Sequence, residues 1–180
     1  MLKKILMIVL YSILGIVAII LLVALFTKKD YVIQKEIVID RPDSTVYEHV
    51  RFLNNHKAFN AWLLKDPNIK LTSTNKDGDV GYVLSYEGNK EVGSGKQEIK
   101  RLQHNKMVDI ELTFLKPFKS VSETPFEFES LGLAQTKVQW TMRGKMNYPM
   151  NFALLFINMD NFLGKDVQKS LANLKTNLER

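Results

Sequence analysis

Cysteine is absent from this chain of 180 residues, and histidine occurs only three times. Without cysteine there is no disulfide framework, no thiolate nucleophile and no thiolate zinc site. The histidines do not replace it, because His49 and His56 are seven positions apart and His104 lies in an expected turn, without zinc-type spacing. We therefore expect no metal site, and we interpret His49 as a surface or packing residue on a helix.

Motifs for nucleophilic or phosphate chemistry are also missing. The sequence has no Gly-x-Ser-x-Gly, and its nine glycines form no phosphate-binding loop between a strand and a helix. Ser94 stands between Gly93 and Gly95, but glycines inside a strand pattern more often mark a bulge than a nucleophile. We assign no catalytic residue and expect no cofactor.

One long hydrophobic run dominates the N-terminus. Residues 5–26 contain no charge, and 16 of these 22 residues are Ile, Leu, Val or Phe. As a helix the run would extend roughly 33 Å, slightly more than a hydrocarbon core of about 30 Å. Each large apolar side chain favours insertion by roughly 0.3–0.6 kcal/mol, so the sum reaches several kcal/mol. The sequence therefore predicts a helix that crosses a membrane.

A cleaved signal peptide is the alternative interpretation of this run. Such peptides have an apolar region of about 7–15 residues and a small-x-small cleavage site. Here the run is longer, and it ends in Ala24-Leu25-Phe26-Thr27, which offers no good pair of small residues. We predict a retained single-pass anchor with basic flanks over residues 1–29 and one water-soluble domain over residues 30–180.

The basic excess lies beside the apolar run. The formal net charge is +6, and four of the 25 basic residues are Lys3, Lys4, Lys28 and Lys29. All 19 acidic residues lie at Asp30 or later, so the domain has 21 basic residues against 19 acidic ones. With no basic run interleaved with aromatics, nucleic-acid binding is not expected. The lysine pairs nearly balance under the positive-inside rule, and a cytoplasmic N-terminal tail would place the domain on the extracytoplasmic side.

The soluble part opens with a strand and two short helices. Residues 31–40 alternate apolar and polar side chains, which predicts a strand. Pro42 ends that strand. Asp43 or Ser44 can cap a helix that continues to about Leu53. A second short helix is expected over residues 57–64, where an Asp-Pro-Asn sequence then breaks it.

In residues 69–146 the apolar residues recur at every second position. Short runs that alternate apolar and polar side chains are separated by turn sequences such as Lys-Asp-Gly-Asp at 76–79 and Leu-Gly at 131–132. Their spacing of about 10–15 residues predicts about six antiparallel strands with one apolar and one wet face. Gly93 and Gly95 inside this pattern indicate a bend in the sheet.

The last segment reads as one long amphipathic helix from about Met150 to Leu178, because apolar residues recur every three or four positions. A helix of about 29 residues, more than twice the average length, needs a broad partner, and the apolar face of the sheet is the only one available. The fold class is therefore α+β, a curved antiparallel sheet around a C-terminal helix. Because a bent sheet cannot close completely around one helix, a cavity is expected between them.

Short stretches along residues 31–180 also match the order and spacing of a known family. The stretches are IVIDRPDSTV at 37–46, FNAW at 59–62 with Asp66-Pro67, GDVG at 78–81, GNKEVGSG at 88–95, and a C-terminal pattern of Met159-Asp160, Gly164-Lys165-Asp166 and LANL at 171–174. Together they resemble the START-like (SRPBCC) superfamily and, within it, the bacterial polyketide cyclase/dehydrase-type proteins. The resemblance implies a helix-grip fold whose hydrophobic cavity takes a lipid-like or polycyclic molecule. It supplies no shared catalytic motif.

Aromatic, Met and aliphatic side chains on the predicted inner faces are the candidates for lining this cavity, since small-ligand sites are mostly apolar. They are Tyr82, Tyr86, Ile110, Leu112, Phe114, Phe126, Phe128, Val138, Trp140, Met142, Phe156, Met159 and Leu163. The same residues would equally suit a solid core, and the sequence does not separate these two interpretations.

The anchor, the expected cavity and the missing catalytic set favour a membrane-anchored domain that binds a hydrophobic small molecule. The alternative is a cyclase- or dehydratase-type enzyme in which Glu98 or Tyr86 acts as an acid or base inside the cavity. Exposure is the default for Glu98 and for Lys96 on the same strand, which weighs against that role. A third hypothesis is a module that recruits a protein partner. The expected partners are the lipid bilayer and the hydrophobic ligand.

Overall fold

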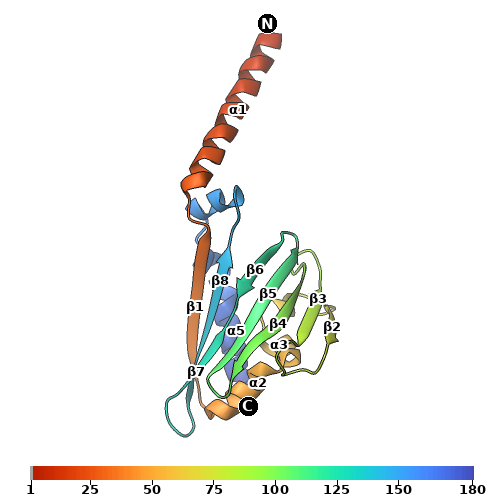
Figure 1. The fold of residues 1–180 in the computed structure, drawn as a ribbon, viewed down its shortest axis with the longest axis vertical. Helices are drawn as coiled ribbons and strands as arrows, with labels where there is room; N and C mark the ends of the chain where they lie inside the picture. The colour runs from red at the N-terminus through yellow and green to blue at the C-terminus, as the bar shows by residue number, and fades with distance from the viewer. Residues whose placement is uncertain (1) are drawn as a thin grey trace.

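The computed structural model describes residues 2–180. An N-terminal helix, α1 (Leu2–Phe26), projects away from the rest of the chain, which forms a curved sheet around the C-terminal helix α5 (Gly164–Glu179) (Figure 1). The most apolar part of α1 has a mean hydropathy of 3.1 and is not buried by other parts of the protein. By length and composition, α1 is able to cross a membrane.

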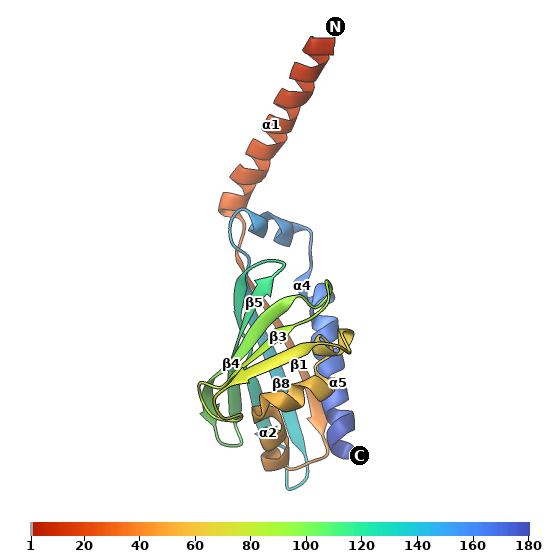
Figure 2. The ribbon, with the colours of Figure 1, turned by 90° about the vertical axis from the view of Figure 1, so that its right-hand side faces the viewer.

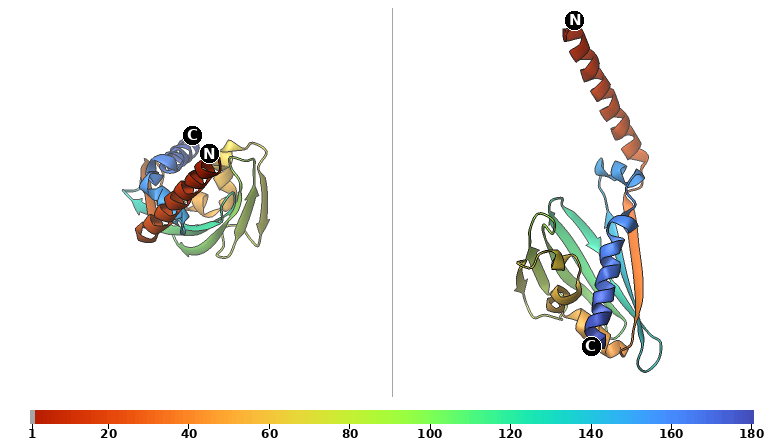
Figure 3. Two further views of the ribbon diagram at one scale, coloured as in Figure 1. Left: turned by 90° about the horizontal axis from the view of Figure 1, so that it is seen from above. Right: turned by 180° about the vertical axis from the view of Figure 1, so that it is seen from behind.

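The described residues form one antiparallel sheet of eight strands. The strands are β1 (Asp30–Ile39), β2 (Lys70–Thr74), β3 (Val83–Glu87), β4 (Ser94–Gln103), β5 (Met107–Lys116), β6 (Ser120–Glu123), β7 (Phe126–Ser130) and β8 (Thr136–Lys145). Their order across the sheet is β1-β8-β6-β5-β4-β3-β2, and β7 pairs with both β5 and β8. Seen from above, the strands curve around the helices (Figure 3). The predicted α+β arrangement is confirmed.

The predicted meander contains seven strands, β2 to β8, instead of about six. The additional strand arises at Thr124-Pro125, where one run of alternating residues is divided into β6 and β7. Pro125 has no N–H to donate to a neighbouring strand. Thr124 instead turns inward, and both its backbone N–H and its hydroxyl donate to the carbonyl oxygen of Ile110.

A bulge bends the sheet where β4 pairs with β5. The pairing register shifts between Ser94 and Gly95. A Cβ atom on Gly95 would overlap the carbonyl oxygen of Thr113 and the hydroxyl of Tyr86, so this position requires glycine. The prediction of a bend is confirmed at Gly95, whereas Gly93 lies outside the strand, in the turn that precedes β4.

Four short helical segments lie between β1 and β2 and cover one end of the sheet. They are α2 (Asp43–Arg51), η1 (Leu53–Asn55), α3 (His56–Phe59) and η2 (Leu63–Lys65). The helix after Pro42 is confirmed, but the single helix predicted over residues 57–64 is wrong. It is interrupted at Asn60, whose backbone is extended and whose side-chain oxygen accepts a hydrogen bond from the N–H of Trp62.

The prediction of one helix from Met150 to Leu178 is also wrong. The segment is divided into η3 (Met150–Leu155), α4 (Met159–Phe162) and α5. Asn158 interrupts the helix, because its extended backbone stops the preceding turn and its side chain caps the next one by accepting from the N–H of Asn161. Figure 2 shows η3 beside the lower end of α1, while α4 and α5 continue down the sheet.

Helix α5 packs against β1, β8 and α3 and carries the predicted apolar stripe. Its buried apolar side chains are Val167, Leu171 and Leu174. Opposite them lies a continuous core that includes Ile33, Tyr82 and Phe126. The apolar face of the sheet is therefore the partner of α5, as the sequence predicts.

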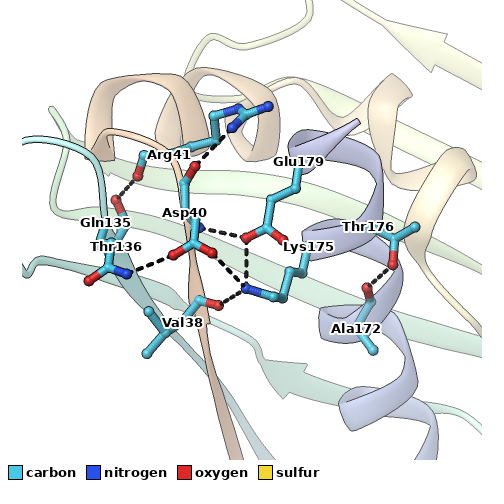
Figure 4. Close-up of polar contacts among 9 residues, drawn as sticks. All are labelled: Val38, Asp40, Arg41, Gln135, Thr136, Ala172, Lys175, Thr176 and Glu179. Carbon is cyan, nitrogen blue, oxygen red and sulfur yellow. Dashed lines mark hydrogen bonds and ion pairs between the residues drawn. The ribbon is translucent and has the colours of Figure 1, made fainter.

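A polar cluster fixes the C-terminal end of α5 to the edge strand β1 (Figure 4). The ammonium group of Lys175 donates to the carbonyl oxygen of Val38 and to the carboxylate of Glu179, both at 2.7 Å. The same carboxylate accepts a hydrogen bond of 2.6 Å from the N–H of Asp40. The hydrogen bonds from Asp40 and Lys175 lower the pKa of the Glu179 carboxyl group.

Candidate functional site

A cavity of about 60 Å³ lies between the curved sheet and the start of α5. Its walls come from α3, η2, β3, β4, β5, β7, β8 and α5, and most of its lining is apolar. On the scale where an apolar cavity of about 150 Å³ holds benzene, this volume accommodates only a few water molecules or a small group. The interior is therefore neither completely filled nor open enough for a polycyclic guest without movement of its walls.

Exposure of the lining residues distinguishes the floor of the cavity from its mouth. His56, Ile110, Phe126 and Trp140 are buried and form the floor, where the rings of Phe126 and Trp140 stack with centroids 4.4 Å apart. The half-buried members of the lining form the mouth. These are Trp62, Leu112, Phe114, Leu163 and Asp166. Burial decreases along β5 from Ile110 to Phe114, so the cavity opens toward the turn between β5 and β6.

Three polar side chains in the lining end in atoms that have no hydrogen-bond partner within the protein. They are the hydroxyl oxygen of Tyr86 on β3, the side-chain oxygen of Gln97 on β4 and the indole nitrogen of Trp140 on β8. The three residues are 4%, 6% and 6% exposed. Leaving a buried polar atom unpaired costs about 1–3 kcal/mol, so three such atoms around one cavity require an explanation.

The two buried titratable groups in the lining, the imidazole of His56 and the phenol of Tyr86, are neutral at neutral pH. Burial lowers the pKa of His56 to about 4. It outweighs the hydrogen bond that joins Nε2 of the imidazole ring to the carbonyl oxygen of Val50 at 2.8 Å, and also the nearby side chain of Gln97, which raises the pKa. Burial likewise raises the pKa of the Tyr86 phenol to about 12. The floor therefore presents polar but uncharged groups to the cavity.

An ion pair lies beside the mouth of the cavity. The ammonium of Lys65 on η2 is 2.8 Å from the carboxylate of Asp166 on α5, and it lies 4.3 Å above the ring of Trp62. Ser170, one turn along α5, accepts a hydrogen bond from the N–H of Ala61 at 2.8 Å. These contacts join η2 to the first turns of α5 and hold the mouth narrow.

Eight of the candidate residues come together in the cavity lining. They are Tyr86, Ile110, Leu112, Phe114, Phe126, Trp140, Met142 and Leu163. The remaining five lie elsewhere. Tyr82, Phe128 and Val138 are packed in the solid core, and Met159 only flanks it. Phe156 is 76% exposed and faces away from the cavity, because the interruption at Asn158 places it beside η3 and not on α5.

The alternative acid–base residue Glu98 lies on the outer face of β4, so its proposed position inside the cavity is corrected. Its carboxylate pairs with the ammonium of Lys100 at 3.0 Å. Successive side chains of a strand point to opposite faces, and here Gln97 and Ile99 point inward. Glu98 and Lys96 both lie on the solvent side of the sheet, where neighbouring side chains leave each of them half-buried.

Several lining residues were not predicted from the sequence. They are His56, Asn60, Trp62, Leu63, Gln97, Thr124, Asp166, Val167 and Ser170. For Gln97 a signal existed, since alternation backward from the apolar Ile99 places it on the inner face. For the others, local pattern gives no signal, because they reach the cavity only through the packing of η2 and α5 against the sheet.

Among residues 2–180, no group of three His, Cys, Asp or Glu side chains is arranged to hold a metal ion. His49 lies on α2 and tilts against the ring of Phe59, with centroids 6.1 Å apart. Burial lowers the pKa of His49. His104 lies in the exposed turn after β4 and meets the edge of Tyr47.

Comparison with solved structures identifies the fold. The truncated norcoclaurine synthase of Thalictrum flavum superposes with a TM-score of 0.63 at 12% identity, covering 86% of this chain and 97% of that one. The Aha1 protein of Colwellia psychrerythraea gives a TM-score of 0.59 at 18% identity, covering 83% and 96% of the chains. Protein CV1439 of Chromobacterium violaceum gives 0.60 at 14% identity, covering 83% and 97%. No family model and no curated protein matches the sequence. The helix-grip, START-like fold implied by the resemblance is confirmed.

Proposed function

We propose that this protein is a membrane-anchored domain that binds a mainly apolar small molecule in the cavity between its sheet and α5. The observation that carries the proposal is the set of three unpaired polar atoms on otherwise apolar walls. Tyr86 offers a hydroxyl, Gln97 an acceptor and Trp140 a donor, and all three residues line the same cavity. A guest with an apolar body and one hydroxyl or carbonyl group would pair with them and remove their desolvation penalty.

We propose that the ligand contacts the residues that line the cavity, which include eight of the sequence candidates. The small volume implies that the ligand enters by widening the mouth. Trp62, Phe114 and Leu163 are half-buried, and the half-buried ion pair between Lys65 and Asp166 contributes on the order of 1 kcal/mol. Separating η2 from α5 is therefore the least costly way to enlarge the space.

The anchoring part of the proposal divides the chain into residues 1–29, which hold it in the bilayer, and residues 30–180, which bind the ligand. It is supported by the length and hydropathy of α1 and by its projection from the domain without burial. An anchor keeps the domain within reach of compounds that partition into lipid. A ligand that carries a single polar group on an apolar body is such a compound.

Tryptophan fluorescence tests the ligand site directly, because the chain has only two tryptophans. In the Trp62→Phe variant of the full-length protein in nanodiscs, Trp140 in the cavity floor becomes the only emitter. We expect octanol to change its emission saturably, and chlorooctane to bind about tenfold more weakly because it cannot donate to Gln97. Native mass spectrometry of the full-length protein should show the added mass. No saturable change and no added mass would refute the proposal.

Neighbouring residues on β4 provide a matched pair of variants. Gln97→Leu removes the acceptor inside the cavity and keeps a similar side-chain volume, so the preference for octanol over chlorooctane should disappear. Glu98→Gln changes the outer face of the same strand and should leave both affinities unchanged. Equal effects of the two variants would contradict the assignment of Gln97 to the ligand.

A cyclase- or dehydratase-type enzyme is the second candidate function. It is favoured by the buried imidazole and phenol in the cavity, and norcoclaurine synthase, a protein of the same fold, has been solved with dopamine and hydroxybenzaldehyde. However, a pKa of about 4 for His56 and about 12 for Tyr86 matches proton transfer near neutral pH poorly. Turnover that His56→Gln abolishes without loss of fold would establish the enzyme in place of the binding domain.

A further inference from the structure

The end of the domain from which α1 leaves carries a concentration of exposed apolar side chains. On η3 and the residues that follow it, Phe156 is 76% exposed, and Met150, Leu155 and Ile157 are exposed as well. We call these four residues the anchor-side patch. Apolar side chains that are exposed side by side on a soluble surface mark an interaction site. In the sequence Phe156 continues the stripe of α5, but in the structure it is exposed at the end of the domain together with its three neighbours.

The anchor-side patch is held rigidly against α1. The side chain of Asn151, which is completely buried, donates hydrogen bonds to the carbonyl oxygens of Ala24 at 2.7 Å and Thr27 at 2.9 Å. Ala24 lies in the last turn of α1, where backbone carbonyls have no partner within the helix, and Thr27 directly follows that turn. Helix α1 and η3 are therefore joined where the apolar run ends, and Figures 1 and 2 show η3 directly beside that end.

The turn between β5 and β6 adds a second apolar group at the same end. The N–H of Met146 donates to the carbonyl oxygen of Lys29, which places the end of β8 beside the start of β1. Ser122 on β6 pairs with Gly144 on β8, so the turn that precedes β6 extends beyond this level toward α1. Phe118 at the tip of this turn is 69% exposed.

Exposed lysines surround these apolar groups. Lys28 and Lys29 follow α1, and Lys116 and Lys119 flank Phe118 in the β5–β6 turn. No ion pair within the described residues involves any of the four. An apolar centre with a cationic margin is complementary to a bilayer surface, where acyl chains lie below anionic headgroups.

We propose that the anchor-side patch, together with Phe118, inserts into the headgroup–acyl boundary of the membrane that holds α1. The partner is the lipid bilayer, and the inference rests on the proposed anchoring by α1. Insertion at two points beside α1 would fix the domain in one orientation on the membrane. The cavity opens toward the β5–β6 turn, so its mouth would then face the lipid surface from which an apolar ligand enters.

The absence of cysteine makes the test simple, because a single cysteine can be introduced and labelled with an environment-sensitive fluorophore. Full-length Phe156→Cys, Phe118→Cys and Leu133→Cys proteins would be reconstituted in vesicles of phosphatidylcholine and phosphatidylglycerol. Leu133 is the matched control, since it is 99% exposed in the β7–β8 loop at the opposite end of the sheet. A fourth variant, Leu14→Cys, reports on the middle of α1.

We expect brominated lipid to quench the labels at positions 14, 118 and 156 and iodide in the water to quench the label at 133. Substituting exposed residues leaves the fold intact, which circular dichroism would verify. Quenching of position 156 by iodide to the same extent as position 133, with position 14 in lipid, would overturn the docking surface and leave the anchor standing. Iodide quenching at positions 14 and 156 together would overturn both the docking surface and the membrane anchor. Quenching by brominated lipid at position 156 but not at position 14 would support the docking surface and refute a membrane-spanning α1.

Discussion

Removing the hydroxyl of Tyr86 tests the central claim about the cavity, because the sign of its effect is unusual. The hydroxyl is buried, it has no partner within the protein, and its residue is 4% exposed. Losing a buried hydroxyl normally destabilises a protein, since its hydrogen bond contributes about 0.5–1.5 kcal/mol. Here there is no bond to lose, and the desolvation penalty of about 1–3 kcal/mol disappears.

We therefore expect Tyr86→Phe to raise the free energy of unfolding of the ligand-free protein by about 1 kcal/mol. This is the lower end of the range for the desolvation penalty, because the adjoining cavity partly relieves that penalty. Tyr82→Phe is the matched control. Tyr82 is also buried, but its hydroxyl donates to the side-chain oxygen of Asn54 at 3.1 Å, so this variant should lose about 1 kcal/mol. The two substitutions remove the same atom and should shift stability in opposite directions.

Urea unfolding of the full-length protein in detergent, followed by tryptophan fluorescence, measures both changes at constant m-value. With octanol present, Tyr86→Phe should have a lower free energy of unfolding than the unaltered protein. The reason is that the ligand pairs with the hydroxyl of Tyr86, which the variant lacks. If Tyr86→Phe destabilises the ligand-free protein as much as Tyr82→Phe does, the hydroxyl of Tyr86 already has a partner and the argument for an unsatisfied site is wrong.

Three further predictions concern the fold. Burial lowers the pKa of His56 from 6.5 to about 4, so between these pH values the unfolded chain binds a proton that the folded chain does not. The contribution of neutral His56 to the free energy of unfolding is therefore fully present above pH 6.5. It falls by about 3 kcal/mol as the pH decreases to about 4. His56→Phe should flatten this slope in urea titrations, whereas the exposed His104→Gln should keep it. Gly95→Ala should cost about 2 kcal/mol or more in thermal unfolding, because its Cβ would overlap a backbone carbonyl. Asn151→Ala should increase the rate of tryptic cleavage after Lys28 and Lys29, because it releases the last turn of α1.

Each of these predictions has a contradicting result. An unchanged slope in His56→Phe would mean that another group titrates in that range. A shift below about 0.5 kcal/mol for Gly95→Ala, comparable to a Ser94→Ala control, would mean that the bulge can rearrange. A tryptic rate for Asn151→Ala equal to that of the unaltered protein would mean that other contacts hold η3 to α1.

The sequence predicts most of the elements correctly because their signals are local. The uncharged run of α1, the alternation in β1, β5 and β8 and the stripe on α5 each depend on neighbouring residues only. The error over residues 150–178 has a physical cause. Phe152 and Phe156 continue the spacing of the stripe, but Asn158 caps a new helix and the apolar groups before it lie beside α1.

The candidate site also has one part that local sequence patterns predicted and one part that they did not. The apolar lining from β5 and β8 follows from alternation, and eight of the thirteen candidate residues reach the cavity. Of the three polar residues that give the cavity its chemical character, Tyr86 and Trp140 were among the candidates and Gln97 was missed. Glu98 was considered where Gln97 is the inward residue, and His56 was regarded only as one of three scattered histidines.

The sequence by itself determined that this chain has one helix long and apolar enough to span a bilayer, an antiparallel sheet with one apolar face, and no cysteine chemistry. Those properties depend on residue type and on periods of two or 3.6 residues. Only the tertiary structure decided where sheet and helices fail to meet, which polar atoms are left unpaired there, and which apolar residues remain outside the core. A cavity and a surface patch are products of packing between distant segments, so no local pattern encodes them.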